Sequence, residues 1–250
     1  MKKKFAIGSI FLLTYLVFLI ATLPAAVVLS QITLPKNINI TGVTGSIWDT
    51  SIVQVSVDNI TIEQVNSKLS VLSLFTLAPS VSATFGNEFT VGPEGQFELT
   101  ISQDKAKINN AKLFVNANDI AQQLTLAIPM TAQGNVELVL DNVEIDLTKN
   151  KQCIAATGTA SWVKAGVVAF EQDVKLGKLD ANIGCEKGAL TVLISPKNDL
   201  GLTFTANLTL NGKASGNGFL KPGANFPKAL NNVLPFLGKQ DNQGRYRLYF

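Results

Sequence analysis

Residues 136–147 read VELVLDNVEIDL, and this stretch decides which kind of fold the chain adopts. Apolar residues stand at every second position, and their parity shifts by one across Asp141-Asn142. Because neighbouring side chains of a β-strand point to opposite faces, this alternation predicts a strand that is buried on one face only. A β-bulge or a sharp bend at Asp141-Asn142 would keep both halves facing one core, and a tight hairpin is the alternative.

The same pattern recurs along the chain. Residues 53–62 alternate on both sides of Asp58-Asn59, and further alternating segments lie at 97–101, 111–115, 202–210 and 246–250. The segment 202–210 ends at Asn211-Gly212, a dipeptide typical of hairpin turns. No strand-helix-strand rhythm appears, which argues against a parallel α/β sheet. We therefore expect a mainly β fold with a predominantly antiparallel, curved sheet.

Helical signals are few in the β-rich part of the chain. Asn118-Asp119 is a candidate cap for a short helix through Leu124, and Pro227 is a candidate start for one over 228–234. The stretch 64–77 fits either a strand or a helix. The likeness of the two Asp-Asn segments predicts two related β units, at about 36–150 and 151–250.

The N-terminus carries a membrane signal. Lys2, Lys3 and Lys4 precede an uncharged run from Phe5 to Leu29. As a helix this run would be about 37 Å long, more than the roughly 30 Å hydrocarbon core of a bilayer. Lysines before such a run hold the N-terminus in the cytoplasm.

These features predict a cytoplasmic tail at 1–4, a transmembrane signal-anchor helix at 5–29, and an exported β-rich domain at 30–250. A cleaved signal peptide is the alternative. Its apolar region would be about 7–15 residues long and would end in a small-x-small site. Pro24-Ala25-Ala26 is a poor site of that kind, which favours a retained anchor.

Composition excludes several classes of function. The chain has 21 Lys and Arg against 18 Asp and Glu, and all 18 acidic residues follow the predicted anchor. Three of the basic residues precede it, so the exported part is formally neutral and offers no basic face for nucleic acid. The chain contains 0 His, which removes Ser-His-Asp catalysis and His-ligated zinc.

The chain has 2 cysteines, Cys153 and Cys185, both beyond the predicted anchor. In an oxidising compartment such a pair is expected to form a disulfide, which would stabilise the fold by about 3–4 kcal/mol on the chain-entropy model. Two separate buried thiols are the alternative reading. There is no CxxC motif to indicate redox chemistry.

For two further motifs, a structural role is a better explanation than a catalytic or metal-binding role. The segment 45–49 (GSIWD) lacks the second glycine of a nucleophile elbow, so we interpret it as a turn in which Trp48 anchors the first strand. Asp141, Glu144 and Asp146 lie close in sequence, but a calcium site needs six or more oxygens. A solvated strand face explains them. We predict no catalytic residue, no cofactor-binding residue and no metal site.

The half of the chain from Cys153 onward carries a specific order of short motifs. They are Gly158-Thr159-Ala160-Ser161-Trp162, Leu176-Gly177-Lys178-Leu179, Gly184-Cys185-Glu186-Lys187-Gly188-Ala189-Leu190, Gly218-Phe219-Leu220-Lys221-Pro222-Gly223, Phe226-Pro227, Leu237-Gly238-Lys239-Gln240-Asp241 and Gly244-Arg245-Tyr246. Near the N-terminus, Gly42-Val43-Thr44-Gly45-Ser46-Ile47-Trp48-Asp49 follows the predicted anchor. In this order and spacing, the chain resembles the protein N family of the bacterial type II secretion system over nearly its whole length.

The resemblance implies a single-pass inner-membrane protein whose bulk lies in the periplasm. It implies a non-enzymatic role in the export of folded proteins across the outer membrane, through contacts with inner-membrane platform proteins, the secretin being a further candidate partner. It also favours the disulfide between Cys153 and Cys185. No nucleic acid, small-molecule substrate or cofactor is expected.

Two other functions stay open on the residues themselves. The first is a lipid-handling protein with a curved β groove, because strands that are apolar on one face predict a groove lining and an ordinary core equally well. The second is a periplasmic hydrolase acting through carboxylates, for which the sequence shows no pairing.

Overall fold

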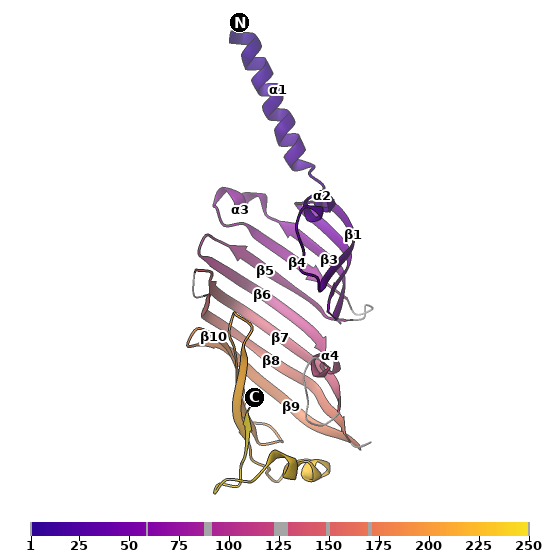
Figure 1. Ribbon diagram of the computed structural model, residues 1–250, viewed down its shortest axis with the longest axis vertical. Coiled ribbons are helices and arrows are strands. Elements are labelled where there is room, and N and C mark those ends of the chain that lie inside the picture. Colours follow the sequence, from indigo (N-terminus) through magenta and orange to yellow (C-terminus); the bar gives the residue numbers. More distant parts are fainter. Residues whose placement is uncertain are drawn as a thin grey trace.

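The computed structural model describes residues 2–58, 60–87, 92–122, 130–148, 151–169 and 172–249. Within these ranges the chain forms one 13-stranded sheet in which the order of the strands in space is their order in the sequence. Every neighbouring pair is antiparallel. This confirms the prediction of a mainly β, antiparallel fold, and Figure 1 shows that the sheet curves along its length.

The strands are β1 (Ile38–Ser46), β2 (Asp49–Val57), β3 (Ile60–Leu69), β4 (Ser80–Phe85), β5 (Glu94–Ile101), β6 (Lys105–Asn116), β7 (Thr131–Asp146), β8 (Gln152–Ala169), β9 (Gln172–Glu186), β10 (Ala189–Ile194), β11 (Leu202–Leu208), β12 (Ala214–Leu220) and β13 (Tyr246–Tyr249). The helices are α1 (Lys2–Ala21), α2 (Ala25–Ser30), α3 (Val71–Phe75) and α4 (Ala117–Ala121), with two 3-10 helices, η1 (Lys228–Asn232) and η2 (Leu234–Leu237). The sheet runs on from β7 to β8, so both predicted β units belong to one sheet.

Helix α1 and the short α2 precede the sheet, and α1 rises from one end of the molecule (Figure 1). Over the part of the chain that the structure describes, no helix combines the length and the apolar character needed to cross a membrane. The anchor at 5–29 therefore stays a prediction.

The two Asp-Asn steps adopt different structures. Val57 of β2 pairs with Ile60 of β3, so the chain reverses at Asp58, which has a φ of 52°. Asn59 lies outside the described residues. The bulge predicted at this step is wrong and the hairpin alternative is right, because a short polar residue such as aspartate tolerates the left-handed backbone of a tight turn.

At Asp141-Asn142 the bulge prediction is confirmed. Strand β7 continues through this step, and its register against β8 shifts between Leu140 and Asn142. The extra residue flips the parity of the strand, so the apolar side chains before and after it face the same side of the sheet.

The short helices differ in detail from their predictions. The stretch 64–77 holds both candidates, because β3 ends at Leu69 and α3 follows. Helix α4 is capped by Asn116, whose side chain accepts a hydrogen bond from the backbone N–H of Asn118 at 2.9 Å, so the cap lies two residues before the predicted one. Residues 123–129, which include the predicted end at Leu124, lie outside the described part. After Pro227 the chain forms 3-10 turns and not the predicted helix.

The most deeply buried apolar cluster lies toward the C-terminal end of the sheet. It consists of Ala165, Val167, Val174, Leu176, Leu179, Leu200, Leu220 and Phe226. The 3-10 helices contribute Leu230, Leu234 and Leu237, which pack against it. Trp162 joins the cluster from β8, and its indole N–H donates a hydrogen bond to the carbonyl of Gln133 at 2.8 Å. This end of the sheet is therefore covered by the chain itself.

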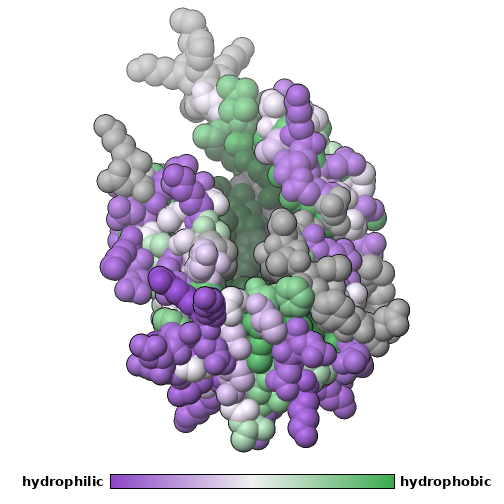
Figure 2. Space-filling view, turned by 60° about the horizontal axis from the view of Figure 1, so that its bottom comes forward, coloured by the Kyte–Doolittle hydropathy of each residue, from purple (hydrophilic) through white to green (hydrophobic). Residues whose placement is uncertain are grey.

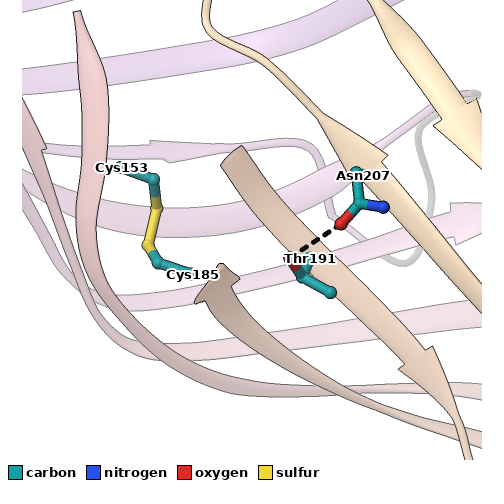
Figure 3. The surroundings of a disulfide bond; sticks show 4 residues. All are labelled: Cys153, Cys185, Thr191 and Asn207. Carbon is teal, nitrogen blue, oxygen red and sulfur yellow. Dashed lines mark hydrogen bonds between the residues drawn. A yellow bond between two sulfur atoms is a disulfide. The ribbon is translucent and has the colours of Figure 1, made fainter. Parts of the chain in front are cut away.

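The predicted pair of cysteines is joined in the structure. Cys153 and Cys185 form a disulfide between the start of β8 and the end of β9, with 5.6 Å between their Cα atoms (Figure 3). Nearby, the Thr191 hydroxyl donates a hydrogen bond to the Asn207 side-chain oxygen at 3.0 Å, across the β10–β11 pair (Figure 3). The disulfide links β8 to β9, and the hydrogen bond links β10 to β11, so both hold neighbouring strands together in the C-terminal part of the sheet.

We expect the Cys153→Ser/Cys185→Ser double variant to lose about 3–4 kcal/mol of unfolding free energy, because the disulfide closes a loop of about 30 residues in the unfolded chain. Urea unfolding of the detergent-solubilised full chain, followed by tryptophan fluorescence, measures this loss. Reduction of the natural chain should produce the same loss and should leave the double variant unchanged. Equal stability of the two proteins under oxidising conditions would contradict the prediction.

Close strand approach at Gly158 gives a second prediction. A Cβ at this position would lie 2.5 Å from the Val139 carbonyl oxygen, whereas one at Gly184 on the adjacent strand would lie 4.0 Å from its nearest neighbour, the Ala156 carbonyl oxygen. We expect Gly158→Ala to destabilise the fold by about 1–3 kcal/mol, because backbone must move to make room. The matched Gly184→Ala variant should stay within about 0.5 kcal/mol of the natural chain. Similar urea midpoints for the two variants would contradict the prediction.

Candidate functional site

The inner face of the curved sheet carries apolar side chains in continuous rows. Residues paired across neighbouring strands point to the same face, so the register defines these rows. One row crosses six strands through Leu69, Val81, Leu99, Ile108, Val143 and Ala156. A second crosses five strands through Leu113, Leu138, Ala160, Ala181 and Ile194. We call the face that carries these two rows the apolar trough.

The opposite face is polar at the neighbouring positions. The row next to the first one runs through Asp49, Lys68, Ser82, Glu98, Asn109, Asn142 and Thr157. Beside the first row, a step of one residue along the strand therefore exchanges hydrocarbon for polar or charged side chains. This is the arrangement that the period-two alternation predicts.

The apolar trough is not packed like an ordinary core. In the described part of β1 to β7, the buried positions are small residues or one valine, namely Thr50, Ala83, Ala106, Ala111, Ala132 and Val143. The larger trough residues Leu99, Ile108 and Leu138 are only partly buried. Among the residues with described burial, no large side chain falls below 2% exposure.

Figure 2 shows the consequence of this packing. A hollow runs into the molecule, its depth is lined by hydrophobic residues, and the outer surface around it is mostly hydrophilic. The inner face of the sheet is thus an open groove over much of its length, whereas the C-terminal cluster closes only one end.

The other end of the sheet is fastened to the N-terminal helices. The indole N–H of Trp48 donates a hydrogen bond to the Ile20 carbonyl at 3.0 Å, and the Ile47 N–H donates one to the Leu23 carbonyl at 3.0 Å. Pro24 forms an isolated bridge with Ser46 at the end of β1. The turn at 45–49 therefore anchors the sheet to the helical segment, whereas the sequence predicted that Trp48 would anchor the first strand to a core.

The α3 segment exposes apolar side chains at this same end of the molecule. Leu72 is 78% exposed, Phe75 is 82% exposed and Leu77 is 85% exposed. No charged residue occurs between Lys68 and Glu88. Figure 1 shows α3 level with α2, at the end of the sheet from which α1 rises. Exposed apolar side chains gathered in this way mark a contact surface.

One acidic residue of β7, Glu144, forms ion pairs on the outer face. Glu144 lies 2.6 Å from the Lys105 ammonium group and 3.4 Å from that of Lys107. The hydrogen bond from Lys105 holds the pKa of Glu144 below its usual value. Asp146 accepts a hydrogen bond from the Thr148 backbone N–H at 2.8 Å. These contacts explain the acidic cluster without a cation.

Within the described ranges, no group of three or more His, Cys, Asp or Glu side chains is arranged to hold a metal ion. The glycine-rich stretch at 212–223 provides a turn at Gly212, where φ is 83°, and a close strand approach at Gly218. The described chain presents three kinds of surface. They are the apolar trough, the polar outer face, and the exposed apolar side chains of Leu72, Phe75 and Leu77, which we call the α3 tip.

The sequence analysis did not locate the trough or the α3 tip. The trough leaves a trace in the sequence, because strand after strand is apolar on one face while few helical segments are available to cover that face. The α3 tip also leaves a trace in the sequence, namely the uncharged run that follows Lys68.

Comparison with known proteins shows one consistent similarity. The family model described as type II secretion system (T2SS), protein N, matches residues 36–249. The type II secretion system protein N of Aeromonas hydrophila is 27% identical over 255 residues, covering 100% of this chain and 98% of that protein. The protein of the same name from Vibrio cholerae is 24% identical over 247 residues, covering 98% and 97%.

The protein of that name from Klebsiella pneumoniae is 25% identical, covering 98% of this chain and 94% of that protein. No solved structure shows significant similarity. The family match spans all thirteen strands, which confirms the resemblance seen in the sequence motifs. The chain belongs to the type II secretion system protein N family.

Proposed function

We propose that this protein is a non-enzymatic, inner-membrane component of the type II secretion system that supports export through contacts of a periplasmic sheet. The observation that carries the proposal is the family match over 36–249, which includes every strand of the sheet. The described surfaces fit a binding role, because they present an apolar groove, two sheet edges and exposed apolar side chains at α3.

The two edges of the sheet are candidate contact sites for other secretion proteins. Strand β1 has one full partner, β2, and on its other side Pro24 bridges only to Ser46. Strand β13 pairs only with β12 in the described chain. Edge strands with unused backbone groups accept a strand from a partner. We therefore assign partner binding, to platform proteins and to the secretin as a further candidate, to these edges.

Membrane anchoring by residues 5–29 is part of the proposal. Along α1 the apolar side chains face outward, with Ile10 66% exposed, Phe11 74% exposed and Phe18 64% exposed. A helix that is apolar on its exposed surface needs an apolar environment. The lysines at 2–4 support a cytoplasmic N-terminus. The proposal therefore assigns residues 1–4 to the cytoplasm and residues 30–250 to the periplasm.

A second candidate function, lipid handling, is favoured by the apolar trough. An open groove lined by hydrocarbon is suited to an apolar ligand. The two functions are compatible, because the trough and the sheet edges are different surfaces.

Deletion of the gene should leave exoproteins in the periplasm of the host, and the full chain supplied in trans should return them to the medium. Comparing the exoprotein in medium and periplasm measures this. A variant with Val53→Ser, at a position 64% exposed, should complement like the natural chain. Normal export in the deletion strain would contradict a required role.

Replacing Leu13 and Leu16 by arginine should release the chain from the membrane, because each arginine near the centre of a spanning helix costs about 2.5–3.5 kcal/mol. The measurement is the fraction that stays in the membrane pellet after alkaline carbonate extraction. Val53→Arg places an arginine at an exposed position of the sheet, 64% exposed in the natural chain, and serves as the control. A natural chain found shortened at its N-terminus and released by carbonate would favour the cleaved signal peptide.

A further inference from the structure

We propose that the apolar trough is a binding site for the acyl chains of glycerophospholipids, drawn from the membrane that α1 enters. The proposal deepens the lipid-handling candidate, and it rests on the proposed anchoring only for the source of the lipid. Four features of the structure lead to it: the chemistry of the inner face, its length, its open packing, and its position relative to the helices.

The inner face offers hydrocarbon over a long continuous path. The row from Leu69 to Ala156 crosses six strands, and at a strand spacing of about 4.8 Å its five steps cover roughly 24 Å. The hydrocarbon core of a bilayer is about 30 Å thick and holds two acyl chains end to end. One row is therefore long enough for an entire acyl chain.

The chemistry of the trough favours an acyl chain over a polypeptide strand. The backbone N–H and C=O groups of inner strands are used in the ladders to both neighbours, and the two rows carry only hydrocarbon side chains, from Leu69 to Ile194. A strand laid on this face would leave its own backbone groups without partners, which costs free energy in an apolar site. An acyl chain has no such groups.

The packing shows that the site needs an occupant. Leu99, Ile108 and Leu138 stay partly exposed although they are apolar residues of the inner face. Exposed apolar area is unfavourable by roughly 25 cal/mol per Å². In the described chain, the C-terminal cluster covers the face of β8 and β9 but supplies no second layer over β4 to β7. A bound acyl chain removes this exposed surface from water.

The position of the trough gives it access to a membrane. The strands follow one another along the long axis of the molecule, so the rows start at the end that carries α1 and α2 (Figure 1). Helix α3 lies at this end (Figure 1), and Leu72, Phe75 and Leu77 in and just after it are exposed. With α1 spanning the membrane, α3 meets the surface of the bilayer, and its apolar tip joins the bilayer interior to the mouth of the trough.

The test compares neighbouring positions that face opposite sides of the same strand. In cells that carry the full chain, p-benzoylphenylalanine replaces the inner residues Leu99 and Leu138 or their outer neighbours Glu98 and Val139, in four separate strains. The cells are grown with tritiated glycerol, which labels glycerophospholipids, and are then irradiated. We expect about tenfold more tritium on the protein from the inner positions, because adjacent side chains point to opposite faces.

Other outcomes overturn the proposal. Equal tritium at inner and outer positions, or none at any, excludes a lipid site in the trough. An adduct of protein size at Leu99 and Leu138 without tritium means that a polypeptide, such as an amphipathic helix, fills it.

Two further readouts separate this proposal from the others. Replacing Leu72 and Phe75 by aspartate should lower the tritium at Leu138 several-fold, because charge at the tip opposes contact with the bilayer; unchanged labelling would overturn entry through α3. Tritium at the inner positions of a chain that carbonate releases from the membrane would overturn the anchoring and uphold the site. Exoprotein export is scored in the same strains, so a failure of the secretion role is seen independently.

Discussion

A single layer of sheet with one apolar face is the constraint on which the rest of the structure depends. A sheet usually buries its apolar face against a second layer. Here the 13 strands follow one another without returning, so the described chain builds no such layer except near the C-terminus. The sheet shields its inner face by curving around it, and the hollow of Figure 2 is what this curvature leaves open.

The curvature has local causes that can be named. The register of β7 against β8 shifts at three places, and β8 shifts again against β9. Each bulge adds a residue to one strand only, which bends and twists the pair. Gly134 and Lys164 lie at these points and have a positive φ, and Asn110 has one at the register shift between β5 and β6. The longest strands thus carry the irregularities that a long curved sheet requires.

The sequence revealed the strands but not their overall arrangement. The alternation of apolar and polar residues identified 136–147 as a strand with one apolar face, because the period of two residues is a property of the strand itself. It did not separate the hairpin at Asp58 from the bulge at Asp141, since both shift parity and differ only in which strands then pair. It could not separate a packed core from an open trough either, because each needs the same half-apolar strands. Trp48 was identified as an anchor, but its partner, the Ile20 carbonyl, depends on a contact across 28 residues.

Because the strands of the sheet lie in sequence order, a strand that comes later in the chain lies farther along the sheet from α1 and α2. With α1 in the membrane, β1 would be the edge nearest to the bilayer, and β13 is the opposite edge, about 58 Å away when measured along the curved sheet at about 4.8 Å per strand. On the proposed function, a partner in the inner membrane would meet the first edge, and a partner that reaches inward from the outer membrane would meet the second. Since the domain is formally neutral, long-range charge does not bring these partners together. In the proposed function, the membrane anchor would do so, and it would also decide which edge each partner meets.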